Sequence, residues 1–176
     1  MNVFLPKSNI LNSAISLDDK RLNKQCLETM QLLKLAEKDQ STLNGAGYHN
    51  HPVYIHYKDN INFLCYYGLI CSKELSSRFK KTYIFLEYFT DKCMQYVPFD
   101  KNMDDFIKPN YIPFYCEGSK NDPTNKRTTE NVENLFQDKL CKKWEQDKAK
   151  GNPPKWTNRD MPNFYIEYLK EKNYEW

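Results

Sequence analysis

The chain has 176 residues, a length that fits a single domain with a substantial hydrophobic core. Its net charge of +3 is only mildly basic, so any contact with nucleic acid must come from local clusters of cations. The six cysteines form no CxxC pair, and Met1–Pro6 has no signal-peptide pattern. These features predict a protein that is not secreted and is cytoplasmic, or nuclear in a eukaryotic host. No apolar run approaches the roughly 18 residues of a membrane span, so no membrane contact is expected.

The first clear helix is predicted from about Leu17 to Lys38. Ser16 is a suitable N-cap, and Asp18 and Asp19 in the first turn would complement the helix dipole. Apolar residues then recur at spacings of three and four, which predicts the face that packs on the core, namely Leu22, Cys26, Met30 and Leu33.

Three further helices are predicted along the chain. Pro52 can open the next one, which extends towards Leu75. The apolar segment from Tyr83 to Tyr96 is also read as a helix, because nothing nearby offers a hairpin partner. The last long helix spans roughly Thr129 to Ala149, with an apolar face of Val132, Leu135, Phe136, Leu140 and Trp144.

The segments between and after these helices are rich in proline and aromatic residues. Residues 98–127 are expected to be irregular, and the polar stretch within them, 117–127, to be an exposed loop. An aromatic arm follows from Trp156 to Trp176. The sequence therefore predicts an all-α fold, in which residues 1–176 form a single compact helical domain with one long irregular loop and an aromatic C-terminal arm.

The first helix carries the most informative polar pattern. At 100° per residue, Arg21, Lys24, Glu28 and Gln31 fall within about 80° of arc, opposite Met30. One carboxylate thus lies in a row of cations and amides. An ordinary solvated face, with Lys24 and Glu28 as an i,i+4 pair, explains the same pattern.

Two other segments could carry chemistry. His49, His51 and His56 are close in sequence, but no cysteine or acid stands at a recognised zinc spacing, so loop histidines are favoured over a metal site. In the proline-stiffened turn after Pro153, Trp156 lies between the cations Lys155 and Arg159, which suits base stacking and phosphate contact. The same turn also suits an arm that tucks Trp156 into the core. No P-loop, GxGxxG, GxSxG or HExxH motif is present.

Taken in chain order, these pieces resemble one family, the pyrimidine-dimer DNA glycosylases of the phage endonuclease V type, which also have AP-lyase activity. The resemblance rests on the opening MNVFLP, on LDDKRLNKQ at 17–25 with Glu28 three residues on, on Asn50-His51-Pro52, on Tyr111-Ile112-Pro113 and on Pro154-Lys155-Trp156. The stretch from about 114 to 127 has no counterpart and looks inserted.

The resemblance implies an all-α enzyme that works without metal or other cofactor and uses the α-amine of its first residue as nucleophile. The nucleophile would be the Met1 amine, and Glu28 would stabilise the cationic intermediate. The partner would be double-stranded DNA with a lesion or abasic site, bound by a monomer. The expected DNA contacts are Asn2, Lys20, Arg21, Lys24, Gln31, His51, Lys155, Trp156 and Arg159.

Physical chemistry supports the amine independently of the resemblance. Imine formation needs a neutral amine, and an α-amine has a pKa of about 7.7–8.0 against about 10.4 for lysine. Roughly a tenth of it is therefore neutral at pH 7, and cations such as Arg21 and Lys24 would lower its pKa further.

Two alternatives stay open at this point. Asn2, Leu27 and Gln31 stand where the phage enzyme has arginines, so the same scaffold could act on another modified base. A non-catalytic DNA-binding module that uses the basic face of the first helix is the other alternative. Trapping with borohydride distinguishes an enzyme from such a module, and a panel of lesions distinguishes the two enzymes.

Overall fold

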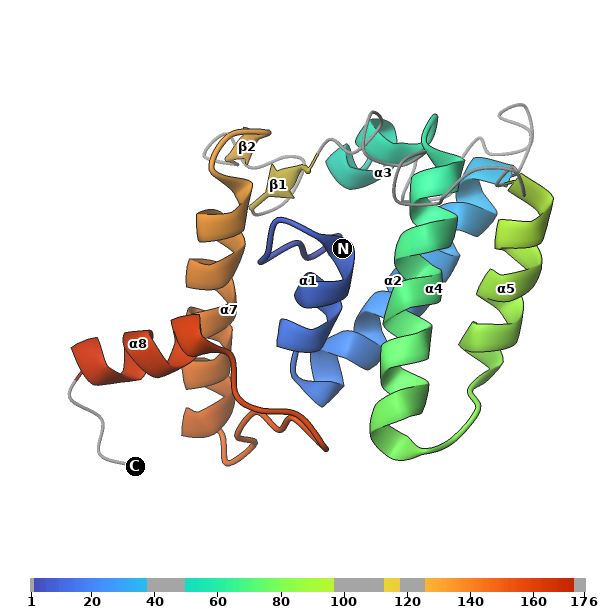
Figure 1. Ribbon diagram of the computed structural model, residues 1–176. Coiled ribbons are helices and arrows are strands. Elements are labelled where there is room, and N and C mark those ends of the chain that lie inside the picture. The colour runs from blue at the N-terminus through green and yellow to red at the C-terminus, as the bar shows by residue number, and fades with distance from the viewer. Residues whose placement is uncertain (1, 38–49, 97–112, 118–125, 173–176) are drawn as a thin grey trace.

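The computed structural model describes residues 2–37, 50–96, 113–117 and 126–172. Within these ranges the chain is mostly helical, as predicted, with a single two-stranded ribbon (Figure 1). The helices are α1 (Ile10–Ser16), α2 (Asp19–Glu37), α3 (Pro52–Tyr57), α4 (Ile61–Phe79), α5 (Ile84–Tyr96), α7 (Val132–Ala149) and α8 (Asn163–Glu171). The strands β1 (Tyr115–Cys116) and β2 (Arg127–Thr128) are antiparallel, with Tyr115 opposite Thr128. None of the described helices is long and apolar enough to cross a membrane.

The predicted first helix is confirmed as α2, but its beginning was wrong. The helix starts at Asp19, and Ser16 is not its N-cap because Ser16 ends the preceding helix α1. There the Ser16 hydroxyl donates to the carbonyl of Asn12 at 2.8 Å. The sequence analysis missed α1, since seven residues are too few to show a clear apolar period.

The single helix predicted from Pro52 is in fact two, α3 and α4, which a break at residues 58–60 separates. Pro52 does open α3, and His51 is the N-cap: its Nδ1 accepts a hydrogen bond from the backbone nitrogen of Val53 at 3.2 Å. The helix predicted from Tyr83 is confirmed as α5.

The C-terminal third is more regular than its sequence indicated. The predicted helix at 129–149 is confirmed as α7, which begins three residues later, at Val132. The aromatic arm contains a further helix, α8, which was not predicted. Of the segment expected to be irregular, residues 98–112 and 118–125 lie outside the described ranges, and the rest contributes β1 and the start of β2.

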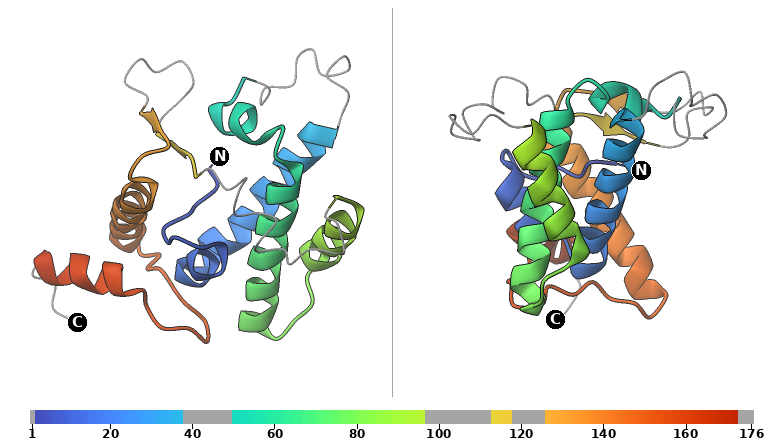
Figure 2. Two further views of the ribbon diagram at one scale, coloured as in Figure 1. Left: turned by 45° about the horizontal axis from the view of Figure 1, so that its top comes forward. Right: turned by 90° about the vertical axis from the view of Figure 1, so that its right-hand side faces the viewer.

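The helices pack in two groups around the buried N-terminal segment. On one side α2, α4 and α5 contact one another, and on the other α7 contacts α8 and β1 (Figures 1 and 2). Gly68 lets α4 and α5 approach closely, because a Cβ there would lie 2.2 Å from the Phe89 ring. Residues 3–5 are buried between the two groups, and the Phe4 ring meets the Phe136 ring of α7 edge to face at 5.2 Å. This packing buries residues 3–5 in the interior of the protein.

Candidate active site

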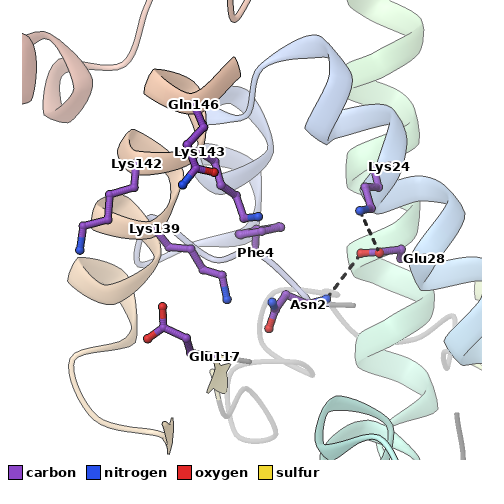
Figure 3. Close-up of a pocket in the computed structure, with 9 residues that line it drawn as sticks. All are labelled: Asn2, Phe4, Lys24, Glu28, Glu117, Lys139, Lys142, Lys143 and Gln146. Carbon is purple, nitrogen blue, oxygen red and sulfur yellow. Dashed lines mark hydrogen bonds and ion pairs between the residues drawn. The ribbon is translucent and has the colours of Figure 1, made fainter. Parts of the chain in front are cut away.

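A cavity of about 370 Å³ opens between α2, the N-terminal segment, β1 and α7. Figure 3 shows α2 with Lys24 and Glu28 on one wall, the lysines of α7 on the other, and Asn2 between them. The lining combines four lysines with two carboxylates, and its members are Asn2, Phe4, Lys24, Glu28, Glu117, Lys139, Lys142, Lys143 and Gln146.

Glu28 lies on the cavity wall with 13% of its side chain exposed. Its Oε1 is 3.6 Å from Nζ of Lys24, the i,i+4 pair that the sequence predicted. Its Oε2 accepts from the backbone nitrogen of Asn2 and from Nε2 of Gln25, each at 3.5 Å. The carboxylate therefore faces the second residue of the chain, which lies 26 positions away in sequence.

Asn2 connects the beginning of the chain to the opposite wall. With its amide oriented to satisfy both neighbours, its side-chain nitrogen donates to the carbonyl of Cys116 at 3.0 Å and its oxygen accepts from Nζ of Lys139 at 3.2 Å. Residue 2 is thus held between the carboxylate of Glu28 and strand β1. The predicted nucleophile, Met1, lies outside the described residues.

Three lysines of α7 form a basic wall that the sequence analysis missed. Lys139, Lys142 and Lys143 share one side of the helix, because spacings of three and four return to the same side. The sequence KLCKKWEQ at 139–146 could have indicated this wall, because its three lysines recur at spacings of three and four beside the apolar residues Leu140 and Trp144. It was overlooked because lysines on a helix usually form an ordinary solvated face.

The basic wall is partly desolvated. Nζ of Lys139 donates to the Cys116 carbonyl at 2.9 Å and lies 4.9 Å from the centroid of the Tyr115 ring. Burial lowers the pKa of Lys139. The Glu117 carboxylate raises this pKa in part, and the charge of Lys143 lowers it further. For Lys143, burial lowers the pKa first, and the charges of Arg21 and Lys24 lower it further. Cations that repel one another in a half-buried cavity would attract an anionic ligand.

Glu117 adds a carboxylate that helix geometry alone could not place. The sequence analysis described Glu28 as the one carboxylate in the row formed with Arg21, Lys24 and Gln31 on α2, and that description holds. In the folded chain Glu117, which directly follows β1, contributes a second carboxylate on the opposite wall.

Two of the predicted DNA contacts on α2 pair with Asp147 of α7. Arg21 is buried, and its guanidinium contacts Asp18 at 3.2 Å and Asp147 of α7 at 2.9 Å. Lys20 also pairs with Asp147, at 3.2 Å, although it is largely exposed. Arg21 therefore connects α2 to α7, and its predicted contact with DNA stays a prediction. Gln31 is exposed on α2, outside the set of residues that line the cavity.

The histidines show structural contacts. His51 caps α3, and burial lowers its pKa. His56 stacks on Phe114 with the ring centroids 4.4 Å apart. His49 lies outside the described residues. In the ranges that the structure describes, no group of three His, Cys, Asp or Glu side chains is arranged to hold a metal ion.

The turn after α7 packs against the helical core. Nε1 of Trp156 donates to the Ser16 carbonyl at 3.1 Å, and its ring meets that of Trp144 at 5.0 Å. Arg159 donates from Nε and Nη2 to the two carboxylate oxygens of Glu74, at 2.9 and 3.0 Å. Lys155 is exposed. Of the two roles that the sequence left open for Trp156, the geometry favours the core.

We therefore expect Trp156→Ala to destabilise the protein by about 3 kcal/mol, near the lower end of the cost for a buried aromatic residue because Trp156 is partly exposed. Binding to damaged and undamaged DNA should fall equally. Thermal melting beside binding titrations measures both effects, and Lys155→Ala should leave the melting temperature unchanged. A Trp156→Ala protein of wild-type stability that loses affinity only for damaged DNA would instead assign the ring to base stacking.

The fold and the cavity define a mostly helical protein that brings a carboxylate and a wall of lysines to its own N-terminal segment, a site suited to a polyanionic substrate. Residues 1–85 match the family model described as pyrimidine dimer DNA glycosylase, which confirms the resemblance that the sequence motifs show. The match supports a DNA glycosylase role and, with it, a DNA substrate. No curated protein and no solved structure gives a match.

The matched residues supply one half of the cavity. They run from the N-terminal segment to the start of α5 and include Asn2, Lys24 and Glu28. The other half, formed by Glu117 and the lysines of α7, lies beyond the matched residues.

Proposed function

We propose that the protein is a DNA glycosylase with AP-lyase activity on ultraviolet-induced pyrimidine dimers, with the α-amine of Met1 as nucleophile. One observation carries the proposal: in a lysine-walled cavity, Oε2 of Glu28 lies 3.5 Å from the backbone nitrogen of Asn2. The α-nitrogen of residue 1 is three covalent bonds from that nitrogen, and so within about 4 Å of it. Covalent geometry thus supports an amine and a carboxylate at the same cavity.

The proposed reaction begins with attack of the neutral amine on the sugar C1′. The C1′–N bond to the base breaks, and its electron pair leaves with the base. One amine proton neutralises the departing base. The other moves to O4′ as the C1′–O4′ bond opens, which leaves an imine in equilibrium with its protonated form. Removal of a C2′ proton next expels the 3′ phosphate, and hydrolysis of the imine frees the enzyme. Extrusion of the target nucleotide from the duplex would give access to C1′.

The charges of the cavity suit each step. The lysine charges disfavour protonation of a nearby amine, which raises its neutral fraction. Glu28 supplies the negative charge that stabilises the iminium and the oxocarbenium-like state preceding it. Lys24, Lys142 and Lys143 line the cavity where a phosphate backbone would pass.

The remaining DNA contacts and the assembly stay proposals. Lys20, Gln31, His51 and Lys155 are proposed to contact DNA outside the cavity. Residues 1–176 are proposed to act as one domain and as a monomer.

Trapping the intermediate tests the mechanism. An abasic-site duplex incubated with the protein in borohydride and a strong chelator is expected to give a covalent adduct, because hydride adds to the iminium carbon. Peptide mapping should place the adduct on the N-terminal peptide. An adduct on the peptide of Lys139 or Lys143, the lysines whose pKa burial lowers, would contradict the α-amine nucleophile.

Two further outcomes concern the reaction class. DNA binding without trapping would indicate a non-catalytic binding module. Trapping without release of pyrimidine dimers, in a panel of modified bases, would indicate another lesion.

A further inference from the structure

Gln25 is a buried amide at the meeting point of α2, α4 and the N-terminal segment. Only 1% of it is exposed, and it precedes Glu28 by three residues on α2. Its Oε1 lies 2.9 Å from the backbone nitrogen of Phe4 and 2.7 Å from the hydroxyl of Tyr67, which is fully buried on α4. The same hydroxyl lies 3.0 Å from the carbonyl oxygen of Phe4.

These contacts determine which way the amide points. A backbone N–H can only donate, so the atom of Gln25 that faces Phe4 must be the oxygen. The amide nitrogen then faces away from Phe4, and it lies 3.5 Å from Oε2 of Glu28. One buried group therefore fastens the N-terminal segment with its oxygen and offers a donor to the carboxylate with its nitrogen.

The contact between the Gln25 amide and the Glu28 carboxylate does more than stabilise the core. A buried hydrogen-bonded amide can be replaced by an apolar group of similar shape at little cost when all its partners are removed together. Here the partners are the Phe4 backbone, the buried Tyr67 hydroxyl and the Glu28 carboxylate, and of these the carboxylate lines the cavity. A distance of 3.5 Å is long for a hydrogen bond, and such contacts commonly tighten when substrate binds.

We infer that Gln25, held by Tyr67, is a positioning residue that keeps the Glu28 carboxylate directed at the N-terminal segment. The inference rests on the proposed function for its catalytic consequence. The contact itself does not depend on that function, so it can be tested separately. Gln25 acts on the reaction through Glu28 and the backbone of Phe4.

The test replaces the donor by an acceptor of the same shape, in Gln25→Glu. Two carboxylates at this distance share a proton, so the pair should release its last proton at higher pH. A carbon-13 NMR titration of the labelled Glu28 carboxyl group should show a midpoint at higher pH than in the wild type. In single-turnover cleavage of dimer-containing DNA, the acidic limb of the pH–rate profile should also shift to higher pH. The rate at neutral pH should fall by roughly 10- to 100-fold, as is typical for groups that orient a reacting side chain.

The matched control is Gln95→Glu, which makes the same charge change at an exposed position on α5. It should leave the Glu28 titration, the rate and the pH profile unchanged. If Gln25→Glu does not fold, Gln25→Met replaces it: this variant removes the donor with an apolar side chain of similar volume. It should also raise the Glu28 midpoint and slow cleavage at saturating DNA.

The outcomes separate the two proposals. A folded Gln25 variant with the wild-type Glu28 midpoint and pH profile would overturn the positioning role. If the wild-type protein binds dimer-containing DNA without cleaving it, while the midpoint still moves in the Gln25 variant, the proposed function fails and the contact stands.

Discussion

Glu28→Gln is expected to slow single-turnover cleavage of dimer-containing DNA by roughly 10²- to 10⁴-fold, the usual contribution of a side chain that moves protons or stabilises developing charge. Glutamine keeps the shape of the side chain and an oxygen that can accept from Asn2, so stability should change little. It cannot supply the negative charge that stabilises an iminium in a cavity lined by lysines.

DNA affinity should separate this effect from simple loss of binding. Because a carboxylate repels phosphate, Glu28→Gln should bind DNA at least as tightly as the wild type. Glu87→Gln, at an exposed position on α5, makes the same charge change and should cleave normally. Cleavage by Glu28→Gln at the wild-type rate would reduce Glu28 to an ordinary ion-pair partner of Lys24.

The double variant Lys142→Gln/Lys143→Gln is expected to weaken binding of damaged and undamaged duplex alike. Each phosphate contact releases counterions and adds about 0.9 to the magnitude of the negative slope of log K against log salt concentration. Loss of two contacts should therefore lower that magnitude by about 2. At about 0.15 M salt, each lost contact should cost roughly 5-fold in affinity on this relation.

The control for this double variant removes two lysine charges outside the cavity. Lys80 and Lys81 lie at the end of α4, in the turn before α5 and outside the cavity lining, and both are exposed. Lys80→Gln/Lys81→Gln should lower the salt slope much less, which salt-dependent binding titrations of both double variants can measure. Equal slopes for the two double variants would show that the basic wall of α7 makes no special contact with DNA.

The sequence by itself determined the helical class of the fold and the faces that the long helices bury. The apolar period of α2 and α7 is a local property, and the residues that form it are buried or nearly so in both helices. The sequence also indicated Glu28, because a single acid among cations and amides on one side of a helix follows from helix geometry alone. The short helix α1 and the break between α3 and α4 escaped prediction, since helix ends depend on individual caps more than on periodicity.

The tertiary structure decided which charges meet. Arg21 and Asp147 are 126 residues apart, and only the folded chain brings them together in a partly buried ion pair. The fold also brings the lysines of α7 and Glu117 to the cavity that Glu28 lines, and it places the ring of Trp156 against that of Trp144. Local spacing shows which face a residue occupies, but the partner on that face comes from a distant element. The partner then decides whether a cation is available to a ligand or neutralised within the protein.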